Sequence, residues 1–408
     1  MNKIPELLSP AGDPEKMRFG IAYGADAVYM AGQRFGMRAA AANFDDEALR
    51  RCIAEAHAHG VKCYITVNIM PSCRDLPALP AYLELLQDAG ADAMIVADVG
   101  VIRMAQKYAP GVPLHISTQT SILNPEAANF WADMGAERVV LARELSLEEI
   151  AEIRAKTPKS LEIEAFVHGA MCISYSGRCL ISQYMTGRDA NHGACAQPCR
   201  WNYSLMEEKR PGEFFPVEED SRGTYLYNSK DMCMIEHIPE MIEAGIDSFK
   251  IEGRMKTALY VATVARTYRL AIDDYLKDPK LYEEHMLWYL DQISNCTYRQ
   301  FTTGFYFGKP DETSQIYDSN TYVREYTYLG FAEEIDERGL ARLTQRNKFS
   351  VGETIEIMKP DGRNIPVTVE AIYNEEGEAM ESAPHAQQRI YVKLTEMPEV
   401  FDILRRGE

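Results

Sequence analysis

Long apolar runs are missing from this sequence of 408 residues, and no stretch approaches the roughly 18 residues of a membrane-spanning helix. The first residues, Met1–Glu6, also lack the apolar segment that a secretory signal carries. We therefore expect a cytoplasmic protein that has no membrane partner.

Basic residues are outnumbered, with 61 acidic side chains against 43 lysines and arginines and a net charge of −18. A chain of this charge does not bind nucleic acid or an anionic membrane over its whole surface. Any contact with RNA must then be confined to a local basic groove.

Several common motifs are absent. No G-x-G-x-x-G follows the first expected strand, so dinucleotide binding has no support, and no H-E-x-x-H points to a zincin-type protease. The cysteines also lack the C-x2-C pair of zinc ribbons and the C-x2-C-x2-C run of small ferredoxins.

Cysteine itself is present nine times, and five of the nine lie between Cys172 and Cys233. An odd number in a chain without a signal segment disfavours a disulfide scaffold. The clustered thiols either pack as small apolar side chains or bind a soft metal, and their spacing alone leaves the metal open. The five are Cys172, Cys179, Cys195, Cys199 and Cys233.

A repeated pattern runs along the first 250 residues: a helical stretch, a glycine, a small or acidic residue and a short apolar run. The glycine suits the residue after a helix, where φ is positive, and the apolar run suits a strand buried on both faces. With three further apolar runs the pattern predicts eight strands. The repeat glycines are Gly24, Gly60, Gly90, Gly135 and Gly245.

Eight strand–helix units in about 270 residues predict an α/β fold, a TIM-like (β/α)8 barrel, with an open doubly wound sheet as the alternative. About eighty residues separate strand seven from strand eight, which predicts a long Cys-rich insertion at about 170–240. We expect the barrel over 1–280, an irregular connection over 281–325 and a small β-barrel domain over 326–408.

The run Glu164–Cys179 resembles the signature of the collagenase-like peptidase family, whose catalytic type is unassigned. The opening Glu6–Gly12, the stretch Asn228–Asp231 and the stretch Lys250–Lys256 are similar to that family too, and the resemblance covers nearly the whole chain. Some members are known as collagenases, and others are RNA or quinone hydroxylation proteins.

The length and the β tail are similar to the members that form 5-hydroxyuridine at the tRNA wobble position. That resemblance implies tRNA as a partner, prephenate as a hydroxyl source, a paralogous subunit as a further partner and a [4Fe–4S] cluster as cofactor. The family pattern assigns the cluster ligands to Cys172, Cys179, Cys195 and Cys233, with Cys199 as an alternative to Cys195 and zinc as the alternative metal. Four protein thiolates would leave no iron open, so the cluster would be structural or redox-active.

Charged residues after strand eight form the strongest site outside the cysteines. Lys250, Glu252 and Arg254 alternate, which would place them on one side of an ideal strand at the barrel mouth. Three charges there are costly unless they are paired or used. His168 follows strand seven and could act as a general acid or base, or simply orient the insertion.

Arginines lie among the cysteines, at Arg178, Arg188 and Arg200. Their guanidinium groups suit RNA phosphates or a dicarboxylate such as prephenate, unless they pair with nearby acidic residues or with cluster sulfurs. Tyr175 could stack on a base or shield the cluster.

Three functions remain open from the sequence. The first is a cluster-dependent tRNA hydroxylase, in which His168, Lys250 and Glu252 are catalytic and Arg254 joins the substrate-binding residues. The second is a peptidase, for which the closeness of Cys172 and His168 in the sequence is the only support. The third is a non-catalytic cluster protein within a hydroxylation complex.

Overall fold

The computed structural model describes residues 4–37, 43–171, 175, 179–190, 193–201, 204–205, 215–216, 230–296, 300–309 and 326–407. Two compact units divide the chain. The first comprises Met1–Met17, Asp26–Lys256 and Arg299–Tyr322, and the second comprises Arg18–Ala25, Thr257–Tyr298 and Val323–Glu408. No helix within the described ranges is long and apolar enough to cross a membrane.

Eight parallel strands close into a barrel in the first unit, because the last strand pairs with both the first and the seventh. This confirms the TIM-like fold and excludes the open sheet. In chain order the strands are β1 (Glu6–Pro10), β2 (Ala27–Met30), β3 (Lys62–Val67), β4 (Ala93–Val96), β5 (Leu114–Ile116), β6 (Arg138–Val140), β7 (Glu162–Ala170) and β11 (Ser248–Ile251).

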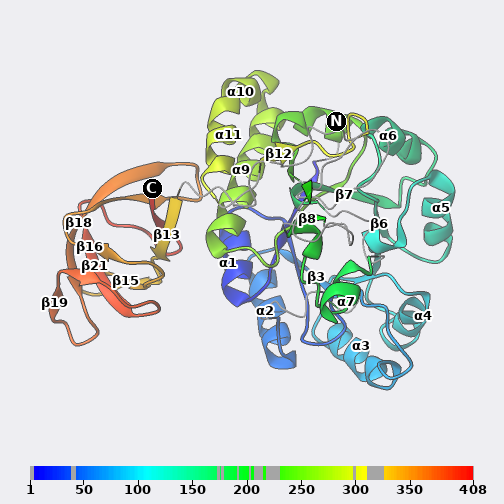
Figure 1. Cartoon of the computed structure of the whole chain (residues 1–408), viewed down its shortest axis with the longest axis horizontal. Coiled ribbons are helices and arrows are strands. Elements are labelled where there is room, and N and C mark those ends of the chain that lie inside the picture. Colours follow the sequence, from blue (N-terminus) through cyan, green and yellow to red (C-terminus); the bar gives the residue numbers. More distant parts are fainter. Residues whose placement is uncertain are drawn as a thin grey trace. The chain divides into compact units, whose positions relative to one another are not determined.

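Helices between these strands lie around the barrel in Figure 1. Each follows a strand and is amphipathic, so its apolar stripe covers the strands. The helices are α1 (Pro14–Ala22), α2 (Asp46–Ala58), α3 (Leu79–Asp88), α4 (Val99–Tyr108), α5 (Pro125–Asp133), α6 (Leu147–Ala155) and α8 (Ile238–Glu243).

Glycines of the sequence repeat stand where helices end, as expected. Gly60 follows α2 with φ 72°, and Gly90 follows α3 with φ 79°. A residue with a side chain is strained at such a φ, which explains why glycine ends these helices. In each repeat the helix therefore ends at a glycine, and the buried strand begins shortly after it.

The insertion between β7 and β11 contains short elements. They are α7 (Ile181–Thr186), a 3-10 turn at Pro198–Arg200, β8 (Ser204–Leu205), β9 (Phe215–Pro216) and β10 (Asp231–Cys233). Strand β10 runs antiparallel to the end of β7 and parallel to β12 (Phe301–Thr302), so both ends of the insertion are tied to the barrel sheet.

An antiparallel β domain forms most of the second unit. Strand β13 (Tyr326–Phe331) pairs with β22 (Ile403–Gly407), and its continuation β14 (Glu334–Ile335) pairs with β15 (Ala341–Thr344). The two ends of the sheet therefore meet on one segment of chain, as the expected small barrel requires. Between them lie β17 (Thr354–Met358), β18 (Asn364–Tyr373) and β21 (Arg389–Leu394), while the remaining pairs involve β16 (Phe349–Ser350), β19 (Ala379–Met380) and β20 (Ser382–Ala383).

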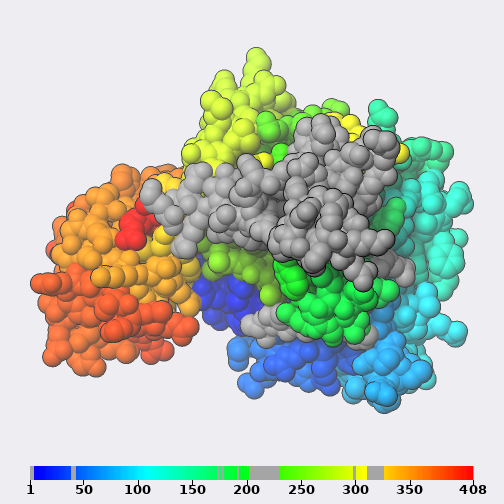
Figure 2. All heavy atoms as spheres, viewed as in Figure 1, coloured from blue at the N-terminus to red at the C-terminus, as the bar shows by residue number. Residues whose placement is uncertain are grey.

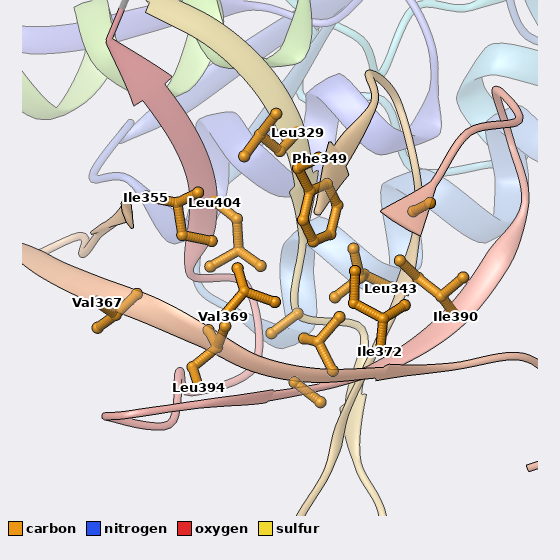
Figure 3. Packing of buried hydrophobic residues seen from close by; sticks show 14 of the residues in the cluster. Leu329, Leu343, Phe349, Ile355, Val367, Val369, Ile372, Ile390, Leu394 and Leu404 are labelled. Atoms are coloured by element: carbon orange, nitrogen blue, oxygen red, sulfur yellow. The ribbon is translucent and has the colours of Figure 1, made fainter. Parts of the chain in front are cut away.

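Alternating apolar side chains of these strands converge on one core, where Leu343, Phe349 and Leu404 are fully buried (Figure 3). Val367 and Val369 show the alternation along β18. One face of each longer strand, such as β17, β18 and β21, is thus removed from water, which is the main stabilisation of a small β domain.

Residues 281–325 are not wholly irregular, which corrects the expectation from the sequence. After α9 (Ala258–Lys277) the chain forms α10 (Pro279–Glu284) and α11 (Met286–Ser294). Tyr289 of α11 is fully buried and stacks on Tyr282 of α10. Aromatic contacts therefore pack these helices together, although the sequence here shows no regular apolar periodicity. Farther on, Tyr306 belongs to the barrel unit and donates a hydrogen bond to the Phe166 carbonyl at 2.6 Å.

Candidate functional site at the barrel mouth

A cavity of about 340 Å³ lies at the carboxyl ends of the barrel strands. Strands or the turns after them supply Tyr29, Thr66, Asn68, Phe166 and Lys250, and the insertion supplies the opposite wall through α7 and the cysteine segment. The green segment that holds α7 is exposed on the face shown in Figure 2. The insertion therefore roofs the position at which (β/α)8 proteins carry their active sites.

Lys250 reaches this cavity from β11 and is 5% exposed. Its Nζ donates to Oε1 of Glu164 at 2.6 Å, and the Glu164 side chain is fully buried on β7. The ammonium also lies 4.7 Å from the centre of the Tyr29 ring. Such pairing and ring contact fix the direction of the Lys250 side chain.

A chain of ion pairs continues below Lys250 through the barrel interior. Arg138 Nη1 lies 3.0 Å from Oε2 of Glu164 and 2.6 Å from Oε1 of Glu6, and Arg138 also bonds Glu162 at 2.6 Å. The same Glu6 accepts from Tyr64 at 2.6 Å. Burial alone would raise the pKa of Glu6, but the hydrogen bonds and charge of Arg138 outweigh it and lower that pKa.

Glu252 and Arg254 line the cavity beside Lys250, so the structure brings together the three charges expected there. Strand β11 ends at Ile251 with a register shift after Lys250, so the following turn, rather than ideal alternation, places the other two. Tyr29 Oη lies 3.3 Å from Oε2 of Glu252, and Arg254 Nη1 lies 3.2 Å from Oγ1 of Thr66.

Polar side chains at the ends of β3 and β5 bond to one another. Asn68 Nδ2 donates to Oε1 of Gln119 at 2.7 Å, and Gln119 Nε2 returns a bond to the Asn68 carbonyl at 2.8 Å. Ser117 adds a further donor to the same amide at 3.1 Å. This pair forms a rigid part of the cavity wall.

His168 lies outside the lining of the cavity. Its ring is 1% exposed and 5.6 Å from the centre of the Phe301 ring, on the part of β7 that pairs with Cys233 of β10. Burial, aided by the charge of Lys256, lowers the pKa of His168 to about 3, so the ring is neutral at pH 7.

Three cysteines face the cavity: Cys179, Cys195 and Cys199. Cys233 is buried on β10, and Cys172 lies outside the described residues. Thiols on one wall are the donors that an iron–sulfur cluster or zinc requires, and the Gln197 amide donates to Cys195 Sγ at 3.4 Å, a contact of the kind that tunes metal thiolates. Within the described ranges, however, no three His, Cys, Asp or Glu side chains are gathered closely enough to hold a metal.

The remaining expected substrate contacts are less defined. Arg188 is exposed just after α7, where its carbonyl accepts from Ser182 Oγ at 2.8 Å, and Tyr175 is 44% exposed. Arg178 and the side chain of Arg200 lie outside the described residues. The structure thus places Arg188 and Tyr175 on the insertion but not in the cavity lining.

Arg143, Phe166 and Glu164 are site residues that reasoning from the sequence missed. Arg143 and Phe166 line the cavity, and Glu164 holds Lys250. Arg143 follows β6 at the same end of the barrel as the other site residues, so its position after a strand was an available signal. The role of Glu164 depends on partners far away in the sequence.

Comparisons with known proteins identify the family. Residues 12–316 match peptidase family U32, and residues 324–405 match the C-terminal domain of that family. A relative from Bacillus subtilis, "tRNA hydroxylation protein P1", is 40% identical and the alignment covers 100% of this chain and 96% of the relative. The "tRNA hydroxylation protein P" of Escherichia coli is 39% identical, with 93% and 91% covered.

A third relative has a name from a different class of function. The "Collagenase" of Porphyromonas gingivalis is 34% identical, and the alignment covers 98% of this chain and 97% of that protein. Both names occur among proteins that share the whole length of this sequence. The chain belongs to peptidase family U32.

Proposed function

We propose that this chain is a cytoplasmic tRNA-modifying enzyme that forms 5-hydroxyuridine at the wobble position. The observation that carries the proposal is the 40% and 39% identity, over nearly the full length, to two proteins named for tRNA hydroxylation. Prephenate is the proposed hydroxyl source, and a paralogous subunit is a proposed partner.

The cavity supports a reaction on a small group that is held away from water. Lys250 supplies a fixed positive charge, and Glu252 supplies a carboxylate within reach of Tyr29. We assign Lys250 and Glu252 to catalysis, with Arg254 binding substrate beside them. Neutral His168, behind the wall, serves as a hydrogen-bonding group that orients the insertion.

Recognition of tRNA belongs to the insertion in this proposal. Arg178, Arg188 and Arg200 contact phosphates, and Tyr175 stacks on a base near the modified nucleotide. The acidic remainder of the chain restricts RNA to this region.

A [4Fe–4S] cluster on Cys172, Cys179, Cys195 and Cys233 completes the proposal, with Cys199 as the alternative to Cys195. When bound, such a cluster supplies one-electron transfer or structural support. Anaerobic purification followed by iron and sulfide analysis should give a brown protein with about four irons per chain. A colourless protein with one zinc per chain would show that these cysteines bind zinc and not an iron–sulfur cluster. Comparing Cys195→Ser with Cys199→Ser then shows which thiol is required.

The test of the function is the tRNA of a strain that lacks this gene. Mass spectrometry should show that wobble nucleosides derived from 5-hydroxyuridine disappear. The wild-type gene should restore them, whereas a Lys250→Met gene that gives equal protein levels should not. Normal nucleosides in the deletion strain would end the proposal.

A peptidase is the competing function, because one relative is named a collagenase. A thiol protease needs a base beside its nucleophile, yet no histidine is among the described residues that line the cavity. Purified protein should therefore leave gelatin intact. Cleavage that Cys172→Ala abolishes while iron content is unchanged would favour the peptidase.

A further inference from the structure

Positive side chains are gathered over two aromatic rings on one wall of the cavity. The guanidinium carbon of Arg143 lies 3.8 Å from the centre of the Phe166 ring, and Lys250 Nζ lies 5.5 Å from the same centre. Arg254 lies 5.9 Å from the Tyr29 ring, which Lys250 also contacts. Ring faces attract cations by their negative potential, so the two rings hold these side chains at the cavity wall, which the Glu252 carboxylate lines as well.

The charge of Lys250 is only partly balanced. Its partner Glu164 divides one carboxylate between Lys250 at 2.6 Å and Arg138 at 3.0 Å. Lys250, Arg138 and Glu164 together carry one net positive charge. Two further carboxylates, Glu6 and Glu162, lie near this group, but both bond Arg138 rather than Lys250. An anion in the cavity would therefore meet Lys250 on its unshared side.

Arg143 has no carboxylate at ion-pair distance among the described residues. One of its nitrogens, Nη1, donates to the Ala170 carbonyl at 2.7 Å, and the buried Nε has no hydrogen-bond partner within the part of the chain that the structure describes. The charge of Arg143 acts on the neighbouring carboxyl of Glu144, but the two side chains form no ion pair within the described ranges. Burial raises the pKa of Glu144. A guanidinium that is partly removed from water and has no carboxylate at ion-pair distance is costly, and a carboxylate bound beside it in the cavity would reduce that cost.

We propose that Arg143 and Lys250 form a carboxylate-binding subsite for a small organic acid. The guanidinium fork suits a carboxylate, Phe166 and Tyr29 offer aromatic faces to the hydrocarbon part of the acid, and about 340 Å³ is room for a small molecule. The insertion roofs the cavity, which favours a free acid over a phosphate within an RNA chain. The proposal rests on the proposed function for the role of that acid, as the co-reactant of the modification.

Binding measurements on the purified full-length protein, without RNA, test the subsite. Phenylacetate and phenylacetamide have nearly the same shape, and only the first carries a charge. Ligand-observed NMR titration should show phenylacetate binding at least tenfold more tightly than phenylacetamide, with inorganic phosphate displacing it poorly. Equal affinity for acid and amide, or displacement by phosphate at equal concentration, would overturn the proposal.

Variants assign the effect to Arg143. Arg143→Met keeps the length of the side chain and should weaken phenylacetate binding about tenfold while leaving phenylacetamide binding unchanged. Arg103→Met, on the exposed face of α4, is the matched control and should change neither. Arg143→Lys keeps the charge without the fork and should lose several-fold, which provides a test if the Met variant does not fold.

Unchanged phenylacetate affinity in both Arg143 variants would contradict the assignment. The result is also separable from the proposed function. If the protein binds the acid but the deletion strain has normal tRNA, the subsite stands and the proposed hydroxylation is wrong. If the protein does not bind the acid but the deletion strain lacks the modified nucleosides, only the subsite is wrong.

Discussion

At the residue scale, the buried charges of the barrel interior share their partners. Glu164 serves Lys250 and Arg138, and Arg138 serves Glu164, Glu162 and Glu6. Such sharing fixes the direction of each side chain, since no member can turn without breaking a second contact. The cavity thereby obtains a lysine whose position depends on residues at the opposite end of the barrel.

Glu164→Gln should destabilise the barrel because it leaves Lys250 and Arg138 with one buried counter-charge fewer. We expect a loss of about 3–5 kcal/mol in the free energy of unfolding, measured by urea titration. Glu162→Gln removes a carboxylate from the same Arg138, but its side chain is 34% exposed, so it should cost about 1 kcal/mol or less. Equal losses in the two variants would show that burial of Glu164 is not the cause.

His115 should make stability depend on pH. Burial, together with the positive charges of Arg138 and Lys250, holds the pKa of His115 well below its usual value of 6.5. The unfolded chain therefore binds a proton below about pH 6.5 that the folded chain does not, and stability falls as the pH falls.

The measurement compares unfolding at pH 7.5 and pH 5.5. The loss should be smaller in His115→Gln than in wild type, by up to about 1.4 kcal/mol per pH unit below 6.5. His59→Gln, at an exposed position, is the control and should behave as wild type does. A wild-type loss that His115→Gln leaves unaltered would contradict the assignment.

Sequence reasoning at this scale succeeded where neighbours along the chain carry the signal. Lys250, Glu252 and Arg254 lie within five positions, and the structure does bring them to one cavity. Glu6 and Arg138 pair across 132 positions, and Ser248 reaches Glu6 across 242. Nothing in the local pattern distinguishes these charges from solvated ones, so only the closed barrel reveals them.

Secondary-structure elements were predictable where a repeat encoded them. Five of the eight barrel strands follow a repeat glycine, and they were predictable because a positive φ and a doubly buried strand are both local requirements. Strand β10 had no such signal, since its three residues are held by antiparallel pairing with β7 and by β12. Helices α10 and α11 were likewise missed.

Ser182 is expected to hold the insertion together at the element scale. Its fully buried hydroxyl donates to the Arg188 carbonyl at 2.8 Å and accepts from the Ala196 amide at 3.0 Å, joining α7 to the cysteine segment. Ser182→Ala should speed amide exchange at Ala196 by roughly tenfold, measured by hydrogen–deuterium exchange.

The control for this variant is Ser294→Ala, which removes one exposed hydroxyl bond to the Asp291 carbonyl. It should leave exchange in the insertion unchanged. Normal protection of residues 193–197 in Ser182→Ala would show that other contacts hold the segment.

The whole molecule consists of two units whose boundaries interleave along the chain. Helices α9–α11 belong with the β domain, because Arg266 of α9 is fully buried and donates to the Lys359 carbonyl at 2.8 Å and to Asn364 at 3.1 Å. Burial, reinforced by the nearby charge of Arg405, lowers the pKa of Arg266 to about 10. The expected boundary at residue 326 marked the β domain, but the expected barrel over 1–280 included α9, and α10 and α11 were not predicted from the sequence.

Arg266→Ala should unfold the second unit at a lower temperature because buried acceptors lose their donor. We expect a loss of about 3 kcal/mol, seen by calorimetry as a shifted transition. Arg363→Ala, which removes a 62% exposed arginine from its pair with Asp361, should shift that transition little. Phenylacetate binding in the barrel cavity should persist in both variants.

Closure of the barrel by its first and last strands has a consequence for synthesis on the ribosome. Glu6, Leu7 and Leu8 pair with Ser248, Phe249 and Lys250, so the ring cannot be completed until the chain has been translated past residue 250. The five clustered cysteines emerge earlier, while no finished cavity shields them. The cofactor that we propose for these thiols would therefore meet them during translation, before the closing strand completes the ring.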